Sequence, residues 1–210
     1  MIDALHWLVA SYLLGAIPTS YLAGKWIRGI DLREHGSRNL GATNLYRILG
    51  RKFAIPVGLF DVAKGAVPVL LFGPRVPAVP YFPIWCGIAA VLGHVFSVFV
   101  GFKGGKGVAT AAGMVIGLAP LAFPVVLIAW ALIVWLTGYV SLASIVAAAL
   151  FPIADYAFHP ARRSLVTVLF DVAIAAFIIW KHRANIQRLM QGTENRFGRQ
   201  RRTETAAPPP

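Results

Sequence analysis

The sequence predicts an all-α integral membrane protein with seven transmembrane helices, an N-terminus outside the cytoplasm and a C-terminus inside it. The composition is the first reason: 58% of the 210 residues are hydrophobic, 13% are charged, and the mean hydropathy is +0.68. Soluble domains are roughly 45–50% apolar and about 25% charged. The other two reasons are a series of apolar segments and the distribution of Lys and Arg between them.

The apolar segments follow one another along the chain and are separated by turn-forming residues. Their expected ranges are 4–26, 53–73, 81–101, 108–121, 122–137, 140–157 and 164–181. The fourth and fifth are short for a span of about 20 residues and would also fit one long helix. We expect two helices because Pro120 and Pro124 interrupt the run, and proline breaks helices. The first segment has no Lys or Arg before it, which favours a retained helix over a signal peptide.

The basic residues support the count of seven. Seven Lys and Arg lie in residues 25–52, two lie in residues 101–110, and seven lie from residue 181 onward. With seven helices these regions share one side of the membrane, whereas six helices would separate the last region from the others. Because cytoplasmic loops are rich in Lys and Arg, we predict that this side is cytoplasmic. The net charge of +12 then reflects topology, and we expect no nucleic-acid partner.

The length suits a single polytopic membrane domain over residues 1–202, followed by a disordered tail at 203–210 with the sequence TETAAPPP. Cys86 is the only cysteine, so the chain offers neither an intrachain disulfide nor a cysteine metal site. We expect no metal and no cofactor.

The first polar loop, DLREHGSRNLGATNLYRILGRK at 31–52, is too polar for a span and too rich in glycine for one helix. Its candidate site residues are Ser37, Arg38, Asn39, Thr43, Asn44 and Arg47. The two arginines offer planar forks that match phosphate oxygens, and the other side chains add neutral donors. The alternative is a solvated loop whose arginines only set the topology. Topology does not require the dense Asn, Ser and Thr content.

The second polar stretch is GFKGGKGVAT at 101–110, between two apolar segments. Its candidate ligand-binding residues are Lys103, Gly104, Gly105, Lys106, Gly107 and Thr110. Glycine amides can approach an anion closely, and a helix starting near Val108 would add free N–H groups and a favourable dipole. The stretch is no nucleotide P-loop, since Gly107 stands where that motif needs Ser or Thr. A flexible turn carrying two lysines is the alternative.

Ionisable residues within the spans are further candidates, because they are costly there unless paired. Asp61 and Lys64 lie three residues apart on one helix face, which predicts an ion pair. His94 should lie at a depth in the membrane similar to that of Asp61. Its role could be that of a general base, an anion ligand or a packed hydrogen-bond donor. Asp171 is expected to be a structural partner for a neighbouring helix.

The C-terminal stretch KHRANIQRLMQGTE at 181–194 directly follows the last span and is typical of a helix at the membrane surface. A positive flank of the last span would explain its arginines. It would not explain Asn185 or Glu194, which we therefore add to the candidate site together with Arg188.

Three motifs in this order resemble the bacterial PlsY family of membrane glycerol-3-phosphate acyltransferases: GSRNLGATN (36–44), GHVFSVFVGFKGGKGVAT (93–110) and HRANIQRLMQGTE (182–194). The chain departs from the usual residues of the family at Ala16 and Ala184, and neither position is a candidate site residue. The resemblance implies transfer of a fatty acyl group from acyl phosphate to the 1-hydroxyl of glycerol 3-phosphate. The products would be lysophosphatidic acid and phosphate, in the first acylation of bacterial phospholipid synthesis. It also implies a site facing the cytoplasm in the inner membrane, and an upstream enzyme of the PlsX type that makes acyl phosphate.

On this resemblance, the glycine-lysine stretch would bind glycerol 3-phosphate in the lipid bilayer's cytoplasmic face. The catalytic candidates are Ser37, Arg38, Asn39 and His94, with Arg38 stabilising the leaving phosphate. Three routes for the acceptor's proton stay open: His94 as base, the substrate's own phosphate, or Ser37 as a covalent nucleophile. We favour direct attack by the bound acceptor.

Two other classes of protein are weighed against the enzyme. A transporter of anionic metabolites would place ionisable groups near the midplane and show internal repeats, and no convincing repeat is seen. A structural subunit would leave the Ser-Arg-Asn and Gly-Lys stretches unexplained.

Overall fold

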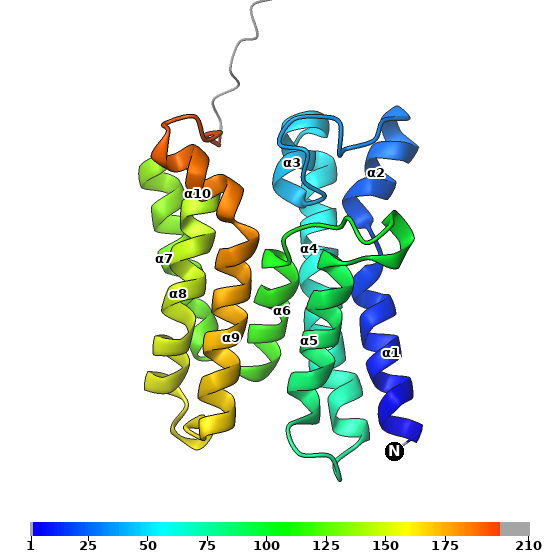
Figure 1. Ribbon diagram of the computed structural model, residues 1–210, viewed down its shortest axis with the longest axis vertical. Coiled ribbons are helices and arrows are strands. Elements are labelled where there is room, and N and C mark those ends of the chain that lie inside the picture. The colour runs from blue at the N-terminus through cyan, green and yellow to red at the C-terminus, as the bar shows by residue number, and fades with distance from the viewer. Residues whose placement is uncertain (1, 198–210) are drawn as a thin grey trace, which may run out of the picture.

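The computed structural model describes residues 2–197, and these form helices whose longest connections lie between α2 and α3 and between α5 and α6. Two groups of helices stand side by side (Figure 1). The first group holds α1 (Ile2–Ala16), α4 (Arg51–Val67), α5 (Phe82–Val95) and α6 (Val108–Leu118), and the second holds α7 (Ala122–Thr137), α8 (Val140–Phe158) and α9 (Leu165–Lys181). In the first group α1 packs on α5 and α4 on α6, and in the second α8 packs on both α7 and α9. The predicted tail at 203–210 lies outside the described residues.

The shorter helices lie mainly at one end. They are α2 (Thr19–Arg28), α3 (Ala42–Leu49) and α10 (Arg183–Met190), and the one-turn or π segments are η1 (Pro68–Phe72), η2 (Gly73–Arg75), η3 (Val98–Val100) and η4 (Pro160–Arg162). Figure 1 shows α2, α3 and α10 at the same end of the molecule, with the N-terminus at the other. The first polar loop and the C-terminal stretch therefore share one end, as the charge distribution predicts. We call it the α3 end.

Length and hydropathy mark three helical stretches as candidate spans: Arg51–Arg75, Phe82–Val100 and Val140–Phe158. α9 and α10 pass the same test only together, and they are bent by 58° at the break between them. Counting this pair as one span gives up to four candidate spans among the described residues. α6 and α7 are apolar and shorter, and they are separate helices, as Pro120 and Pro124 predict. Large apolar side chains face outward, such as Trp135, which is 80% exposed.

The expected first helix, 4–26, is broken between α1 and α2. Pro18 lacks an N–H group and cannot continue the helical hydrogen bonding. Side chains from other segments bind the carbonyl groups left free at the break: Ser97 Oγ donates to Ala16 O at 2.5 Å, and Lys64 Nζ donates to Ile17 O at 2.9 Å. The break is thus held by α4 and the residues that follow α5.

The predicted ion pair on α4 is present and supports this break. Lys64 Nζ lies 2.7 Å from Asp61 Oδ1, and Thr19 Oγ1 donates to the same carboxylate oxygen at 2.7 Å. His94 Nδ1 lies 3.8 Å from Asp61 Oδ1, so the two residues share one depth, as predicted. Asp171 also has a structural partner, since Arg162 Nη2 lies 3.5 Å from its Oδ1.

Candidate active site

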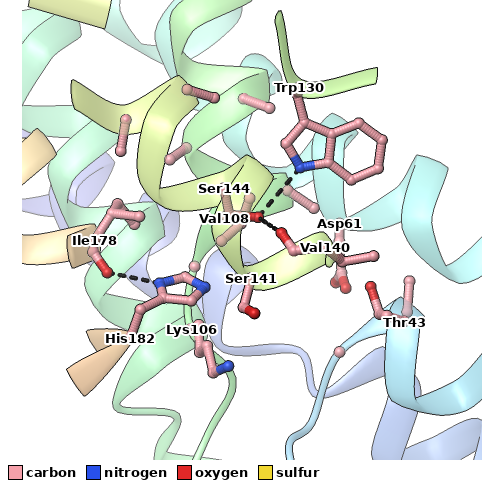
Figure 2. Close-up of a pocket in the computed structure, with 18 of the residues that line it drawn as sticks. Thr43, Asp61, Lys106, Val108, Trp130, Val140, Ser141, Ser144, Ile178 and His182 are labelled. Carbon is pink, nitrogen blue, oxygen red and sulfur yellow. Dashed lines mark hydrogen bonds between the residues drawn. The ribbon is translucent and has the colours of Figure 1, made fainter. Parts of the chain in front are cut away.

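A cavity of about 420 Å³ lies between the two groups of helices. Its polar wall, at the α3 end, is formed by Ser37, Asn39, Thr43, Asn44, Arg47, Asp61, His94, Lys106, Ser141, Ser144, His182, Asn185 and Glu194. Its apolar wall comes from α6, α7, α8 and α9 and includes Val115, Phe123, Trp130, Phe151 and Ile174. Figure 2 shows Thr43 and Asp61 on one side of the space and Ile178 and His182 on the other. The cavity is therefore polar at one end and apolar at the other.

A chain of hydrogen bonds fixes the lysine at the polar end. Lys106 Nζ donates to Asn185 Oδ1 at 2.5 Å, and Asn185 Nδ2 donates to Glu194 Oε1 at 2.8 Å. Arg188 Nε binds the other oxygen of Glu194 at 2.7 Å. Lys106 is thereby aimed into the cavity by α10 and the residues after it, the C-terminal stretch from which Asn185, Arg188 and Glu194 were added to the candidate site.

The charges around this chain are out of balance. Arg47, Lys106 and Arg188 carry three positive charges, and Glu194 carries the negative charge among them. Burial lowers the pKa of Lys106 to about 8; Glu194 opposes the shift, and Arg188 and Arg47 add to it. Burial also lowers the pKa of Arg47. We call these four residues the cationic cluster, and its excess positive charge suits a bound anion.

Asn44 shapes the first polar loop from within. Its Oδ1 accepts from the Ser37 N–H at 2.8 Å, and its Nδ2 donates to the carbonyl groups of His35 at 3.0 Å and Asn39 at 3.1 Å. Gly36 has φ +60, and a Cβ there would lie 2.4 Å from Asn44 Oδ1. The Asn44 amide is thus engaged by the loop itself, and it presents Ser37 and Asn39 to the cavity rather than binding a ligand through its own side chain.

The backbone N–H groups of Gly104 and Gly105 do not face the cavity to bind an anion, as was predicted, but bind carbonyl groups of the protein. The Gly104 N–H donates to Val95 O and the Gly105 N–H donates to His94 O, both at 3.1 Å. A Cβ would lie 2.0 Å from His94 O at Gly104 and 2.2 Å from His94 Nε2 at Gly105. Glycine is needed here because the loop packs directly on the end of α5. Gly107, with φ +84 at the N-cap of α6, does line the cavity.

The structure brings most of the predicted site residues to this cavity. Those that line it are Ser37, Asn39, Thr43, Asn44, Arg47, His94, Lys106, Gly107, Asn185 and Glu194. Arg38 and Lys103 are exposed and do not line it, so Arg47 is the guanidinium of the cavity wall. Thr110 is buried where α6 meets Gly65 of α4, and a Cβ on that glycine would collide with the Thr110 carbonyl. Arg188 acts on the site through Glu194.

Four cavity residues with polar side-chain atoms were not predicted: Trp130, Ser141, Ser144 and His182. Ser141 Oγ donates to Glu194 Oε1 at 2.9 Å, and Trp130 Nε1 donates to Ser144 Oγ at 3.2 Å. His182 Nδ1 lies 2.8 Å from Ile178 O, which makes Nδ1 the protonated nitrogen. His182 stands in the third motif and was visible as an ionisable residue beside the last span. The serines carried no signal, since only the fold brings the start of α8 to Glu194.

The glycerol-3-phosphate acyltransferase family model matches residues 5–192. The chain belongs to this family. It is 46% identical to the glycerol-3-phosphate acyltransferase of Chlorobaculum parvum, over 95% of this chain and 99% of the relative. It is 49% identical to that of Trichlorobacter lovleyi, over 94% and 99% of the two chains.

Two crystal structures of PlsY (YgiH), an integral membrane glycerol 3-phosphate acyltransferase, share the fold of this acyltransferase. The glycerol 3-phosphate form matches with a TM-score of 0.83 and 40% identity, over 93% of this chain and 96% of the other. The lysophosphatidic acid form matches with a TM-score of 0.80 and 39% identity, over 93% and 95%. The family predicted from the three motifs is confirmed. The protein is an integral membrane glycerol-3-phosphate acyltransferase with the all-helical PlsY fold.

Proposed function

We propose that the enzyme transfers a fatty acyl group from acyl phosphate to the 1-hydroxyl of sn-glycerol 3-phosphate. The products are 1-acylglycerol 3-phosphate and inorganic phosphate, and the reaction is the first acylation of phospholipid synthesis. One observation carries the proposal: a cationic polar wall and an apolar wall belong to one continuous cavity. Acyl phosphate needs both, because it joins a phosphate to a hydrocarbon chain. Its anhydride bond is already activated, so no nucleotide is required.

The cationic cluster would bind the two phosphates. Lys106 and Arg47 line the cavity directly, and the first N–H groups of α6 add a favourable dipole beside Gly107. Ser37, Asn39, Thr43 and Asn185 supply neutral partners in the same wall. The crystal structures of PlsY in glycerol 3-phosphate and lysophosphatidic acid forms support this choice of acceptor and product.

The reaction balances as a direct displacement. The 1-hydroxyl oxygen of the acceptor bonds to the acyl carbon, the bond from that carbon to the phosphate oxygen breaks, and phosphate leaves with the electron pair. Arg47 stabilises the growing negative charge on the leaving group, the role first given to Arg38. We assign the hydroxyl proton to a substrate phosphate oxygen. His94 is 7% exposed, and its two ring nitrogens face Asp61 and Gly105.

The variant His94→Gln tests this assignment. Loss of a general base costs about 10²- to 10⁴-fold in turnover. We expect His94→Gln to lower kcat by less than about tenfold, because the substrate supplies the base. A loss of 10²-fold or more with unchanged KM would make His94 the base. An acyl-enzyme trapped on Ser37 would overturn direct attack.

The topology proposed for this enzyme has seven crossings in the bacterial inner membrane, with the N-terminus outside, the α3 end cytoplasmic and one domain over residues 1–202. The position of the polar loop and α10 at one end supports it (Figure 1). Glycerol 3-phosphate then reaches the site from the cytosol. Acyl phosphate arrives from a PlsX-type enzyme on the same side.

The deciding assay uses purified enzyme in detergent, palmitoyl phosphate and labelled glycerol 3-phosphate. We expect labelled 1-acylglycerol 3-phosphate and one phosphate released per product. Palmitoyl-CoA serves as the competing donor. Product from palmitoyl-CoA alone would overturn the donor, and no product from well-folded enzyme with either donor would overturn the whole proposal. Turnover in detergent also separates the enzyme from a transporter, which needs two compartments.

A further inference from the structure

The apolar part of the cavity has a closed end. A buried cluster of Val115, Ala119, Ala122, Phe151 and Ala154 lies there, with Phe123, Val125, Val126 and Ile174 packed against it. Five of these side chains also line the cavity: Val115, Phe123, Val126, Phe151 and Ile174. The Phe151 side chain is 4% exposed. These side chains therefore line the cavity on one side and pack into the hydrophobic core on the other. We call them the floor of the cavity.

One face of α8 runs from the polar wall to this floor. Beyond its first residue, Val140, the α8 residues that line the cavity are Ser141, Ser144, Ala147, Ala148 and Phe151, and they lie in one stripe along the helix. Ten residues separate Ser141 from Phe151, or roughly 15 Å along the helix. The bilayer's hydrocarbon core, about 30 Å thick, holds two layers of chains, so one chain occupies about 15 Å of depth. The stripe, counted from its polar end, therefore spans about the depth of one layer of lipid chains.

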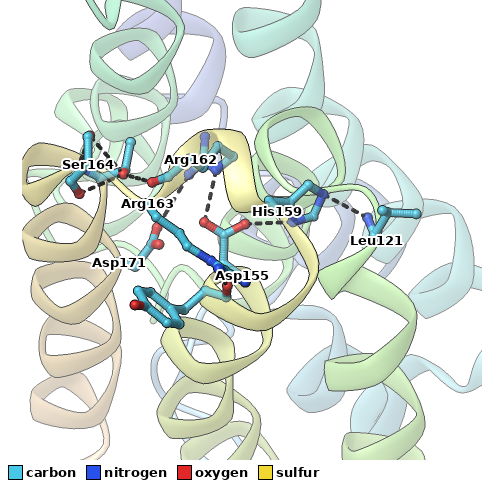
Figure 3. Close-up of polar contacts among 9 residues, drawn as sticks. Leu121, Asp155, His159, Arg162, Arg163, Ser164 and Asp171 are labelled. Atoms are coloured by element: carbon cyan, nitrogen blue, oxygen red, sulfur yellow. Dashed lines mark hydrogen bonds and ion pairs between the residues drawn. The ribbon is translucent and has the colours of Figure 1, made fainter.

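Polar contacts hold the helices together just beyond the floor (Figure 3). Asp155, one turn after Phe151, lies 2.9 Å from both His159 Nδ1 and Arg162 Nε. Arg162 also reaches Asp171 on α9 at 3.5 Å. The Leu121 N–H, in the turn between α6 and α7, donates to His159 Nε2 at 3.3 Å. We call Asp155, His159, Arg162 and Asp171 the α8–α9 clamp. It ties together the helices that surround the floor.

We propose that Phe151, with Phe123 beside it, sets the maximum length of the acyl chain that this enzyme transfers. The inference rests on the proposed function, in which the chain lies in the apolar part of the cavity. A chain whose end just meets the Phe151 ring buries every methylene against protein. A longer chain must bend or leave its end outside the cavity, because the clamp prevents α8 and α9 from moving apart.

The test measures kcat/KM for lauroyl, palmitoyl and stearoyl phosphate with two opposed variants. Phe151→Ala deepens the cavity, and we expect the stearoyl-to-lauroyl ratio to rise about tenfold. Ala148→Phe fills the stripe above the floor, and the same ratio should fall about tenfold. KM for glycerol 3-phosphate should not change in either variant.

Matched controls come from the outer face of the same helix. Ala149 and Phe158 are exposed and do not line the cavity, so Ala149→Phe and Phe158→Ala make the same changes facing lipid. Both controls should keep the wild-type ratio. Phe151→Leu replaces Phe151→Ala if the larger deletion prevents folding, and Ala148→Phe tests the floor independently of either.

An unchanged ratio in folded Phe151→Ala and Ala148→Phe would overturn the proposal. It would mean that the chain leaves sideways, past the exposed cavity residue Leu127, into the bilayer. Binding of 1-acylglycerol 3-phosphates with the same three chains, followed by isothermal titration, gives a readout independent of the donor. If acyl phosphate is not the donor, the wild-type enzyme shows no turnover with it. If Phe151 is not the floor, turnover and binding remain, but substitutions at residue 151 do not change their dependence on chain length.

Discussion

Two clusters of ionisable side chains, one at each end of the second group of helices, differ in charge balance and in what they adjoin. The cationic cluster holds Arg47, Lys106, Arg188 and Glu194, and the α8–α9 clamp holds Asp155, His159, Arg162 and Asp171. In the clamp, two carboxylates face one guanidinium and one imidazole at 2.9 to 3.5 Å. In the cationic cluster, three cations share one carboxylate, and Lys106, Arg47 and Glu194 border the cavity.

The difference separates a binding site from a structural one on physical grounds. Charges within a membrane protein are costly unless they are paired, so a cluster in which both carboxylates face a guanidinium can persist as part of the fold. In an unbalanced cluster beside a cavity, the unpaired positive charges stay energetically unfavourable until an anion binds. A phosphate carrying about two negative charges near neutral pH would offset the excess. The cationic cluster therefore suits a ligand, while the clamp suits a joint between helices.

The largest expected effect comes from removing the lysine of the cationic cluster. Lys106→Ala should lower kcat/KM for glycerol 3-phosphate by about 10³-fold, since on the proposed function a half-buried charge that contacts the substrate phosphate is lost. Thermal stability should change little or rise, because one unpaired cation is gone. Steady-state kinetics with both substrates varied measure the effect.

Lys103→Ala is the matched control for this prediction, because Lys103 stands three residues earlier in the same stretch and is exposed. It should stay within about twofold of the wild type, as is usual for a solvent-screened surface charge. Equal losses in the two variants would show that the stretch acts through its net charge and not through the position of Lys106.

The opposite result is expected at the clamp. Arg162→Ala leaves the carboxylates of Asp155 and Asp171 buried without their shared cation, and it should cost about 3 kcal/mol of stability. KM for glycerol 3-phosphate should stay at the wild-type value in the protein that remains folded. Thermal unfolding in detergent and kinetics on the folded fraction measure the two quantities. A raised KM with unchanged stability would mean that the clamp is not a separate structural joint.

The sequence predicted the membrane class, the helix boundaries near Pro120 and the polar segments that meet at the cavity. It gave the leaving phosphate to Arg38 and not to Arg47, because two arginines in one short loop have the same chemistry and local sequence does not show which one faces the cavity. The choice depends on α3, which turns Arg47 toward the cavity, while Arg38 sits at φ +59 on an exposed turn. The π segment and the break at Pro18 likewise depend on packing between helices.

The glycines show a second limit of sequence reasoning. A Gly-Gly pair between two lysines is compatible both with an anion nest and with close packing of backbone on backbone. The structure selects packing at Gly104 and Gly105, because His94 and Val95 supply the acceptors for their N–H groups. Ser141 shows the converse: it lies at the start of the expected apolar segment 140–157, and the fold brings it to Glu194. Contacts between distant segments carry this information, and local patterns do not.

The smallest expected effect is a dependence of kcat/KM on pH that comes from the cationic cluster. Burial lowers the pKa of Lys106 to about 8, so the free enzyme carries this charge below pH 8 and loses it above. The substrate phosphate, whose second pKa is about 6, stays doubly charged over the same range. Since kcat/KM reports the free enzyme, its value for glycerol 3-phosphate should fall about tenfold between pH 7 and pH 9.

Lys106→Arg distinguishes this cause from others, because a guanidinium stays charged throughout the range. Its kcat/KM should be lower than that of the wild type at pH 7 but nearly constant up to pH 9. Arg162→Ala should keep the wild-type profile, since the clamp does not adjoin the phosphate. An identical fall in Lys106→Arg would assign the titration to another group. Because the bound phosphate stabilises the charged lysine, saturating glycerol 3-phosphate should move the midpoint of the fall in rate to a higher pH, and an unmoved midpoint would separate Lys106 from the phosphate.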